Sequence, residues 1–185
     1  MRTNTLLAER NQALLAQALQ LLQQLPEELY SARPPHFERG GIGTHIRHVL
    51  DHYDAFLDGL DAGRIDYDAR ERDPRTECEI SLGRARLSST IARMGAVFAR
   101  QDVGALGAQR AIQVAMELGG GPAGTRSTSQ SSVGRELQYL VAHTVHHFAL
   151  LAVVLRQFGH EPGPEFGVAP STLRHEETSR GACAH

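Results

Sequence analysis

The stretch ELQYLVAHTVHHFALL, residues 136–151, decides how this 185-residue chain folds. Its apolar residues recur every three or four positions, which is the period of one face of an α-helix. These positions are Leu137, Leu140, Val145, Phe148 and Leu151. The pattern predicts a long, buried helix in the interior of a bundle.

The same helix carries three histidines. His143 and His147 are four residues apart, so their imidazoles lie on one side of the helix, one turn apart, where two ring nitrogens can bind a single ion. His146 points about 100° away from His147 and is not expected to join them. The alternative is a helix whose histidines are solvated at the edge of the bundle.

A second group of histidines lies in residues 44–54, THIRHVLDHYD. Apolar residues around this segment again step by three and four, so it is predicted to form another amphipathic helix. His45, His48 and His52 lie together on the flank of its apolar face. Two facing helices that present imidazoles to a shared interior are a common way to build a metal site in a bundle. Neutral imidazole suits zinc, nickel, iron(II) or copper.

In their order and spacing, these two groups resemble the DinB/YfiT family of metalloenzymes. The segment HVLD begins at His48, and HTVHH begins at His143. The resemblance runs from about residue 6 to about residue 159. It implies an all-α fold, an up-down-down-up four-helix bundle, with one divalent transition metal (Zn, Ni or Fe) held by His48, His143 and His147. Periodicity alone does not choose His48 over His52, and that choice rests on the resemblance.

Length and composition suit one domain with a sizeable core. A formal net charge of −2 and a pI near 6.5 give no footprint for nucleic acid or for an anionic membrane surface. No apolar run approaches the roughly 20 residues that span a bilayer. The two cysteines are far apart, so neither a disulfide scaffold nor a thiolate zinc site is indicated. We therefore expect a cytoplasmic protein with no nucleic-acid partner and no membrane partner.

Four helices are predicted. They span about residues 5–25, 42–61 and 81–100, and from a capping serine at 131 or 132 to about 158. Residues 111–118 alternate loosely with period two, a glycine turn follows, and residues 125–132 are rich in serine and threonine, so a short β-hairpin or an extended crossover is predicted before the last helix. The bundle domain is placed at residues 1–160, and a C-terminal coil tail at residues 161–185.

The charged connection after the second helix supplies candidate substrate-binding residues. In the resembling family this loop borders the metal pocket, and guanidinium groups match carboxylates bidentately. The candidates are Tyr67, Arg70 and Arg72. The alternative is a solvated connection whose charges have no role in a site.

Two functions follow from these patterns. In the first, the protein is an enzyme, because three histidines leave an open position on the metal, with Asp51 or Glu136 as the general base. The resemblance implies that a low-molecular-weight thiol, or water, is activated for transfer to a small electrophilic substrate, in the manner of a transferase or hydrolase. The alternative is a non-catalytic, metal-binding or stress-related bundle, which a fourth nitrogen from His45, His52 or His146 would favour. Bundles of this type often dimerise, so a homodimer is also an expectation.

Overall fold

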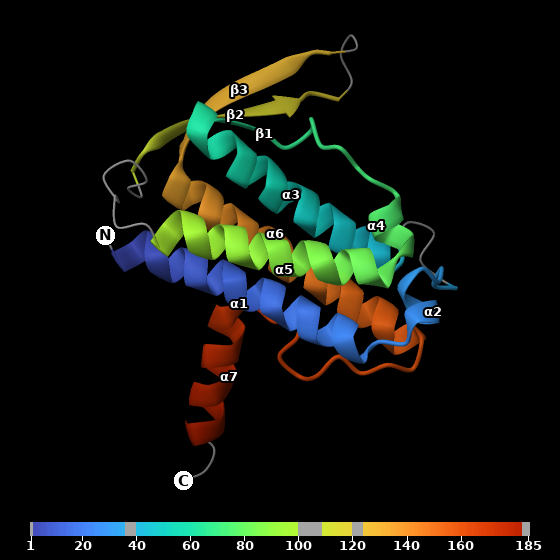
Figure 1. Ribbon diagram of the computed structural model, residues 1–185. Helices are drawn as coiled ribbons and strands as arrows, with labels where there is room; N and C mark the ends of the chain where they lie inside the picture. Colours follow the sequence, from blue (N-terminus) through green and yellow to red (C-terminus); the bar gives the residue numbers. More distant parts are fainter. Residues whose placement is uncertain (1, 36–39, 100–108, 120–123, 183–185) are drawn as a thin grey trace.

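Four long helices form the body of the molecule. The computed structural model describes residues 2–35, 40–99, 109–119 and 124–182 (Figure 1). The long helices are α1 (Arg2–Gln24), α3 (Ile42–Ala62), α5 (Ile80–Ala99) and α6 (Val133–Gln157). Both α1 and α3 pack against both α5 and α6, which confirms the predicted helical bundle. In Figure 1, α1 and α6 run in one direction, and α3 and α5 run in the opposite direction. Short helices α2 (Glu27–Tyr30) and α4 (Arg75–Cys78) lie in the connections, and Arg100, the predicted end of the third helix, lies outside the described residues.

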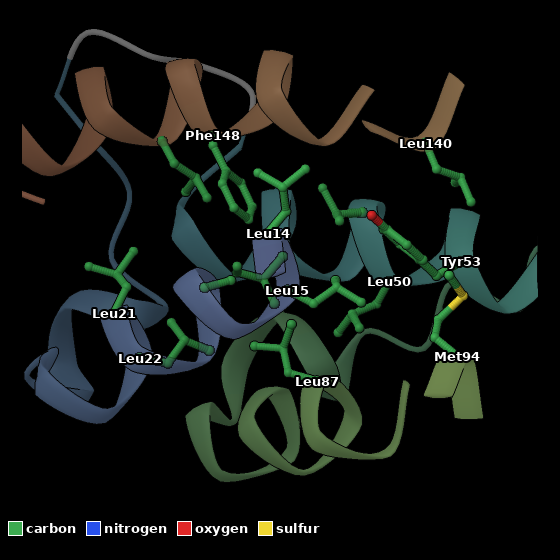
Figure 2. Packing of buried hydrophobic residues seen from close by; sticks show 14 of the residues in the cluster. Leu14, Leu15, Leu21, Leu22, Leu50, Tyr53, Leu87, Met94, Leu140 and Phe148 are labelled. Atoms are coloured by element: carbon green, nitrogen blue, oxygen red, sulfur yellow. The ribbon is translucent and has the colours of Figure 1, made fainter. Parts of the chain in front are cut away.

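The core lies where the apolar faces of the four helices meet (Figure 2). Each fully buried leucine or aromatic side chain contributes roughly 1.5–3 kcal/mol relative to an exposed one. The labelled members are Leu14, Leu15, Leu21 and Leu22 of α1, Leu50 and Tyr53 of α3, Leu87 and Met94 of α5, and Leu140 and Phe148 of α6. The periodic positions of the sequence therefore face this core, as predicted.

One buried polar network ties α1, α3 and α6 together. The Tyr53 hydroxyl donates to Asn11 Oδ1 at 2.7 Å and lies 3.1 Å from the Thr144 hydroxyl. Asn11 Nδ2 donates in turn to the backbone oxygen of Leu137 at 3.1 Å. Directional bonds at the centre of a core prevent one helix from sliding along another, because a shifted helix would leave buried polar groups unpaired.

A small mixed sheet covers one side of the bundle. Its strands are β1 (Arg64–Asp66), β2 (Ala111–Glu117) and β3 (Arg126–Ser132), in the order β1-β2-β3, with β1 parallel to β2 and β2 antiparallel to β3. The antiparallel pair confirms the predicted hairpin, whose turn residues 120–123 lie outside the described residues. The predicted all-α class is corrected by β1, because Ile65 pairs opposite Val114 and the fold becomes mostly helical with a three-stranded sheet.

The tail contains a helix that the sequence analysis missed. Phe166 stacks on Phe148 with ring centroids 4.7 Å apart, which holds the start of the tail on α6. Residues Pro170–Ala182 then form α7, which projects away from the bundle in Figure 1. The prediction of coil throughout residues 161–185 is wrong for this segment. Helix α7 lacks an apolar stripe, which is the signal that predicts a helix from sequence. A proline at the first helical position, here Pro170, is a favourable start for a helix.

By length and composition alone, α6 could cross a membrane, and no other described helix passes that test. A long central helix of a bundle has the same composition. Here α6 packs against α1 and α3, and Leu137, Leu140 and Leu151 on it are fully buried. The expectation that the protein has no membrane partner stays a prediction.

The close approach of β1 to α3 predicts the effect of one substitution. A Cβ atom on Gly59 would overlap the backbone oxygen of Arg64, the first residue of β1. Alanine gains about 1 kcal/mol of helix propensity over glycine, but overpacking against backbone costs about 1–3 kcal/mol. We expect Gly59→Ala to lower the free energy of unfolding by up to about 2 kcal/mol. Urea unfolding measures this change.

The matched control is Gly119→Ala, because nothing described lies within 4 Å of a Cβ atom at that position. An equal loss of stability in the two variants, or a gain in Gly59→Ala, would contradict the close packing of β1 on the helix.

Candidate metal centre

Five histidines converge between α3 and α6, and we call them the histidine cluster. They are His45, His48 and His52 of α3 and His143 and His147 of α6. The ring centroids of His52 and His143 are 4.0 Å apart, and those of His48 and His147 are 4.5 Å apart. The two sequence segments that carry these residues therefore face one another, as a metal site built between two helices requires.

Three members of the cluster form a compact group. His48, His52 and His143 each offer a ring nitrogen, and these atoms all lie within 4.8 Å of one another. His48 Nε2 is 3.1 Å from His143 Nε2. Two nitrogens bound to one ion at 2.0–2.1 Å, at octahedral or tetrahedral angles, are about 2.9–3.4 Å apart. The measured separation therefore fits two ligands of one metal.

The compact group shares His48 and His143 with the predicted ligand set and contains His52 where the prediction has His147. His147 Nδ1 lies 3.0 Å from His45 Nδ1. Its ring still adjoins the group, with its centroid 4.6 Å from that of His143. His147 therefore stays a predicted ligand, and the geometry makes His52 its competitor for the third position.

Burial keeps the cluster imidazoles neutral. Removal from water, reinforced by the neighbouring imidazoles, lowers the pKa of His143 to about 2 and that of His48 to about 3. Burial likewise lowers the pKa of His52 and of His147 to about 4. A metal binds the neutral ring, so these side chains are ready to act as ligands at neutral pH without first losing a proton.

Arg70 reaches the cluster from the connection that follows β1. Its Nη1 atom lies 3.0 Å from His48 Nδ1 and 3.1 Å from His52 Nδ1. A guanidinium only donates hydrogen bonds, and a backbone oxygen only accepts them. His52 Nδ1 also lies 2.8 Å from the backbone oxygen of His48, so it donates to that oxygen and cannot accept from Arg70 at the same time. Of its two contacts, Arg70 can therefore form a hydrogen bond only with His48 Nδ1, to which it donates.

This bond fixes the tautomers of two rings. Because His48 Nδ1 accepts from Arg70, the proton of the neutral ring is on Nε2, which donates to His143 Nε2. The proton of His143 is then on Nδ1, a buried atom for which the described residues supply no hydrogen-bond partner. A buried unpaired donor costs about 1–3 kcal/mol. A metal at His48 Nε2 would move the proton of that ring to Nδ1 and release Arg70.

A cavity of about 420 Å³ opens beside the cluster. It lies between β2, the connection after β1 and the first turns of α6. Its lining residues are His52, Tyr67, Asp68, Val114, Ala115, Met116, Arg135, Glu136 and Tyr139. A volume in this range suits a small-molecule ligand.

Glu136 is the buried acid of this cavity, with 6% of its surface exposed. Its Oε2 accepts from the Tyr67 hydroxyl at 2.8 Å, and its Oε1 accepts from the Ser131 hydroxyl at 2.5 Å. Burial and the adjacent Glu136 carboxylate raise the pKa of Tyr67, which keeps that hydroxyl protonated as a donor. The carboxylate is thus oriented by two hydroxyl groups, one from β3 and one from the connection after β1.

The other predicted site residues lie further from the cavity. Asp51 is buried, and its two oxygens accept from Arg47 at 2.6 Å and Arg86 at 3.1 Å. Asp51 does not line the cavity, and both of its oxygens are already bonded to guanidinium groups, which argues against Asp51 as the general base. Arg72 donates to the backbone oxygen of Asp68 on the exposed side of the loop, so it does not join Arg70 at the cluster.

Tyr139 and Arg135 are among the cavity residues that were absent from the predicted site. Tyr139 stands one helical turn before His143, and their ring centroids are 5.4 Å apart. Arg135 stands one turn before Tyr139. The i, i+4 spacing from His143 through Tyr139 to Arg135 is a signal in the sequence that could have identified both.

Comparisons with known proteins bear on the same region. The DinB superfamily matches residues 10–151, a span that includes every member of the histidine cluster. FK506-binding protein 5 of Rhizopus delemar is 46% identical over 46 residues, which is 25% of this chain. The chain spans 12% of the length of that curated relative, and so short an overlap carries no assignment of function.

Metal titration of single-site variants identifies the ligands. His48 and His143 belong to both candidate sets, so we expect His48→Ala and His143→Ala each to weaken zinc or nickel binding by at least about 100-fold, more than the loss of an outer partner costs. The predicted set requires His147→Ala to lose the metal and His52→Ala to keep it. The reverse result would give the third position to His52, and His175→Ala on the exposed helix α7 serves as the control.

Acid should destabilise the metal-free protein. The cluster pKa values of about 2 to 4 lie below the value of about 6.5 expected in the unfolded chain. Within that window the unfolded chain binds protons that the folded chain does not, so the free energy of unfolding falls as the pH drops below about 6.5. Each such proton contributes about 1.4 kcal/mol per pH unit.

Urea unfolding after removal of metal with a chelator, from neutral pH down to about pH 5, measures this slope. We expect His143→Gln to flatten it and His175→Gln to leave it unchanged. An unchanged slope in His143→Gln would show that the buried imidazole is not the source of the acid sensitivity.

Proposed function

Because the chain belongs to the DinB superfamily, we propose that the histidine cluster holds one divalent transition metal and that the protein is an enzyme acting on small molecules. The metal would activate a low-molecular-weight thiol, or water, for transfer to a small electrophilic substrate. The observation that carries the proposal is the convergence of His48, His52 and His143 beside a cavity that contains a buried carboxylate.

The donor set suits the metal. His48 and His143 would hold it together with His147 or His52, and imidazole nitrogen accommodates zinc, nickel or iron. A divalent ion among neutral imidazoles keeps its full charge and lowers the pKa of a thiol or water, which supplies a nucleophile near neutral pH.

Glu136 is the residue to which we assign proton transfer. It is buried at the cavity, and each of its oxygens already accepts one hydroxyl hydrogen bond. A carboxylate has about four lone-pair sites, so both oxygens keep capacity to take a proton from the incoming nucleophile. Tyr67 and Ser131 hold the carboxylate in place for that step.

Arg70 is the predicted anion-binding residue that best fits this geometry. Its guanidinium lies at the cluster, and it would be released when a metal binds His48 Nε2, because the proton of that ring would then be on Nδ1. The freed side chain would hold a carboxylate of the thiol, since guanidinium and carboxylate pair bidentately. We keep a cytoplasmic location and a homodimer as parts of the proposal.

A non-catalytic metal-binding bundle is the alternative function. One observation favours it: the ring of His52 and the ring of His147 both adjoin those of His48 and His143. Four imidazoles on one ion would close the site, as in structural zinc centres. The cavity and its buried carboxylate favour the enzyme, because a storage site requires neither.

Cobalt substitution with a thiol screen tests the proposal. Glutathione, cysteine and other cellular thiols are added to the cobalt-loaded protein, and a sulfur-to-cobalt charge-transfer band is expected, together with consumption of a model electrophile. His143→Ala should abolish both signals. We expect Glu136→Gln to keep the metal and the band but to slow turnover by about 100-fold or more, the usual contribution of a general base.

Glu161→Gln is the matched control, because Glu161 is an exposed carboxylate that pairs with Arg156 beyond the other end of α6. A stoichiometric metal with no spectral response to any thiol and no turnover would favour the non-catalytic bundle.

A further inference from the structure

Resting on the proposed function, we infer that the cavity beside His52 selects an amphipathic anion as the electrophilic substrate. The apolar body of this substrate lies against β2, and its carboxylate is bound by Arg135 at the mouth. The reacting end then points to Glu136 and the histidine cluster.

An apolar stripe runs along β2, and its members Val114 and Met116 line one wall of the cavity. Alternate residues of a strand share a face, and the stripe consists of Ile112, Val114, Met116 and the adjoining Leu118. Ile112 is 1% exposed, whereas Met116 is 59% exposed and Leu118 is 46% exposed. The stripe therefore begins in the core and continues outward to Met116, most of whose surface the described residues leave exposed. An apolar side chain left uncovered at the edge of a cavity marks a surface for an apolar ligand, and methionine adapts its shape to one.

Aromatic rings form the facing side. The centroids of Tyr67 and Tyr139 are 5.1 Å apart, and the Tyr139 ring stacks toward His143 at an interplanar angle of 25°. Rings of this kind pack favourably against a flat, apolar body. The cavity thus offers apolar contact on two sides between its mouth and the histidine cluster.

The charges of the cavity are separated by depth. Arg135 is exposed, and it forms no ion pair with any carboxylate of the described residues. Glu136 is buried and bonded to hydroxyl groups, and Asp68 accepts from the backbone N–H of Glu117 at 2.7 Å. Among the residues that line the cavity, the deep carboxylate repels an anionic group and the guanidinium at the mouth attracts it. This orientation places the uncharged part of the substrate at the reactive end.

A second copy of the chain could instead cover Met116 and Leu118. The small-molecule occupant is favoured because the stripe includes part of the wall of a cavity that reaches His52. It is also favoured because Arg135, which has no ion pair within the described part of the chain, lines the same cavity. The oligomeric state of a Met116 variant separates the two occupants.

The test uses three probes on the zinc-loaded, full-length protein: 3-phenylpropionate, its uncharged amide, and acetate. Isothermal titration and saturation-transfer NMR measure their binding. We expect 3-phenylpropionate to bind about five- to tenfold more tightly than the amide, as one exposed charge-assisted contact provides, and acetate to bind weakest. Arg135→Gln should remove the preference for the acid over the amide. Met116→Gln should weaken the binding of the acid and the binding of the amide by the same factor.

Arg156→Gln is the matched control, because Arg156 is an exposed arginine at the other end of the same helix. A preference for the acid that survives in Arg135→Gln would show that the carboxylate binds the metal or Arg70, and would overturn the inference. Equal binding of acid and amide to the wild type would also overturn it, as would a dimer that dissociates in Met116→Gln with no change in probe binding.

Binding is measured without turnover, so turnover with thiols in the absence of acid selectivity would refute only this inference. Acid selectivity without any thiol reaction would refute only the proposed function.

Discussion

The contact of α3 with α6 through paired imidazoles is the constraint on which the rest of the structure depends. His48 Nε2 and His143 Nε2 meet at 3.1 Å, so neither helix can slide by a turn without separating them. The Tyr53–Asn11–Thr144 network holds this register from inside the core, one residue along each helix from His52 and His143. The site and the core therefore stabilise the same arrangement of helices.

This arrangement carries a cost that the rest of the fold offsets. The five imidazoles are kept neutral in an environment poor in water, and His143 Nδ1 is buried without a partner among the described residues. On the opposite flank of α3, Arg86 bridges Asp51 and Asp54 of α3 from its place on α5. Those partly buried ion pairs fix the helix that carries three of the histidines. Proteins depart from full hydrogen bonding mainly where they bind or react, which is the pattern here.

Local patterns predicted what depends on one helix at a time. The period of apolar residues gave the four long helices, and the i, i+4 histidines gave the shared face. The competition between His52 and His147 could not be resolved in this way, because it depends on the distance between two helices and on which nitrogen each ring presents. Strand β1 was missed because Ile65 is a single buried residue among charges, and its pairing with Val114 spans 49 positions of sequence. The short loop containing Arg70 could be named as a candidate, but only the folded chain shows that it contacts His48 and that Arg72 does not.

The sheet is the feature that supports the proposed enzyme over a bundle that only stores a metal. Four helices alone could hold the imidazoles, but the described cavity at His52 has β2 as one wall and the connection after β1 as another. Strand β1 is laid directly on α3 at Gly59, and this contact positions Tyr67 to hold Glu136 and Arg70 to reach His48. Strand β3 ends at the N-cap of α6, where Ser132 accepts from the backbone of Arg135 and Ser131 donates to Glu136. The hairpin thus sets the start of the very helix that carries His143. A storage site gains nothing from such a wall, whereas a site that must admit, orient and protect a small substrate requires one.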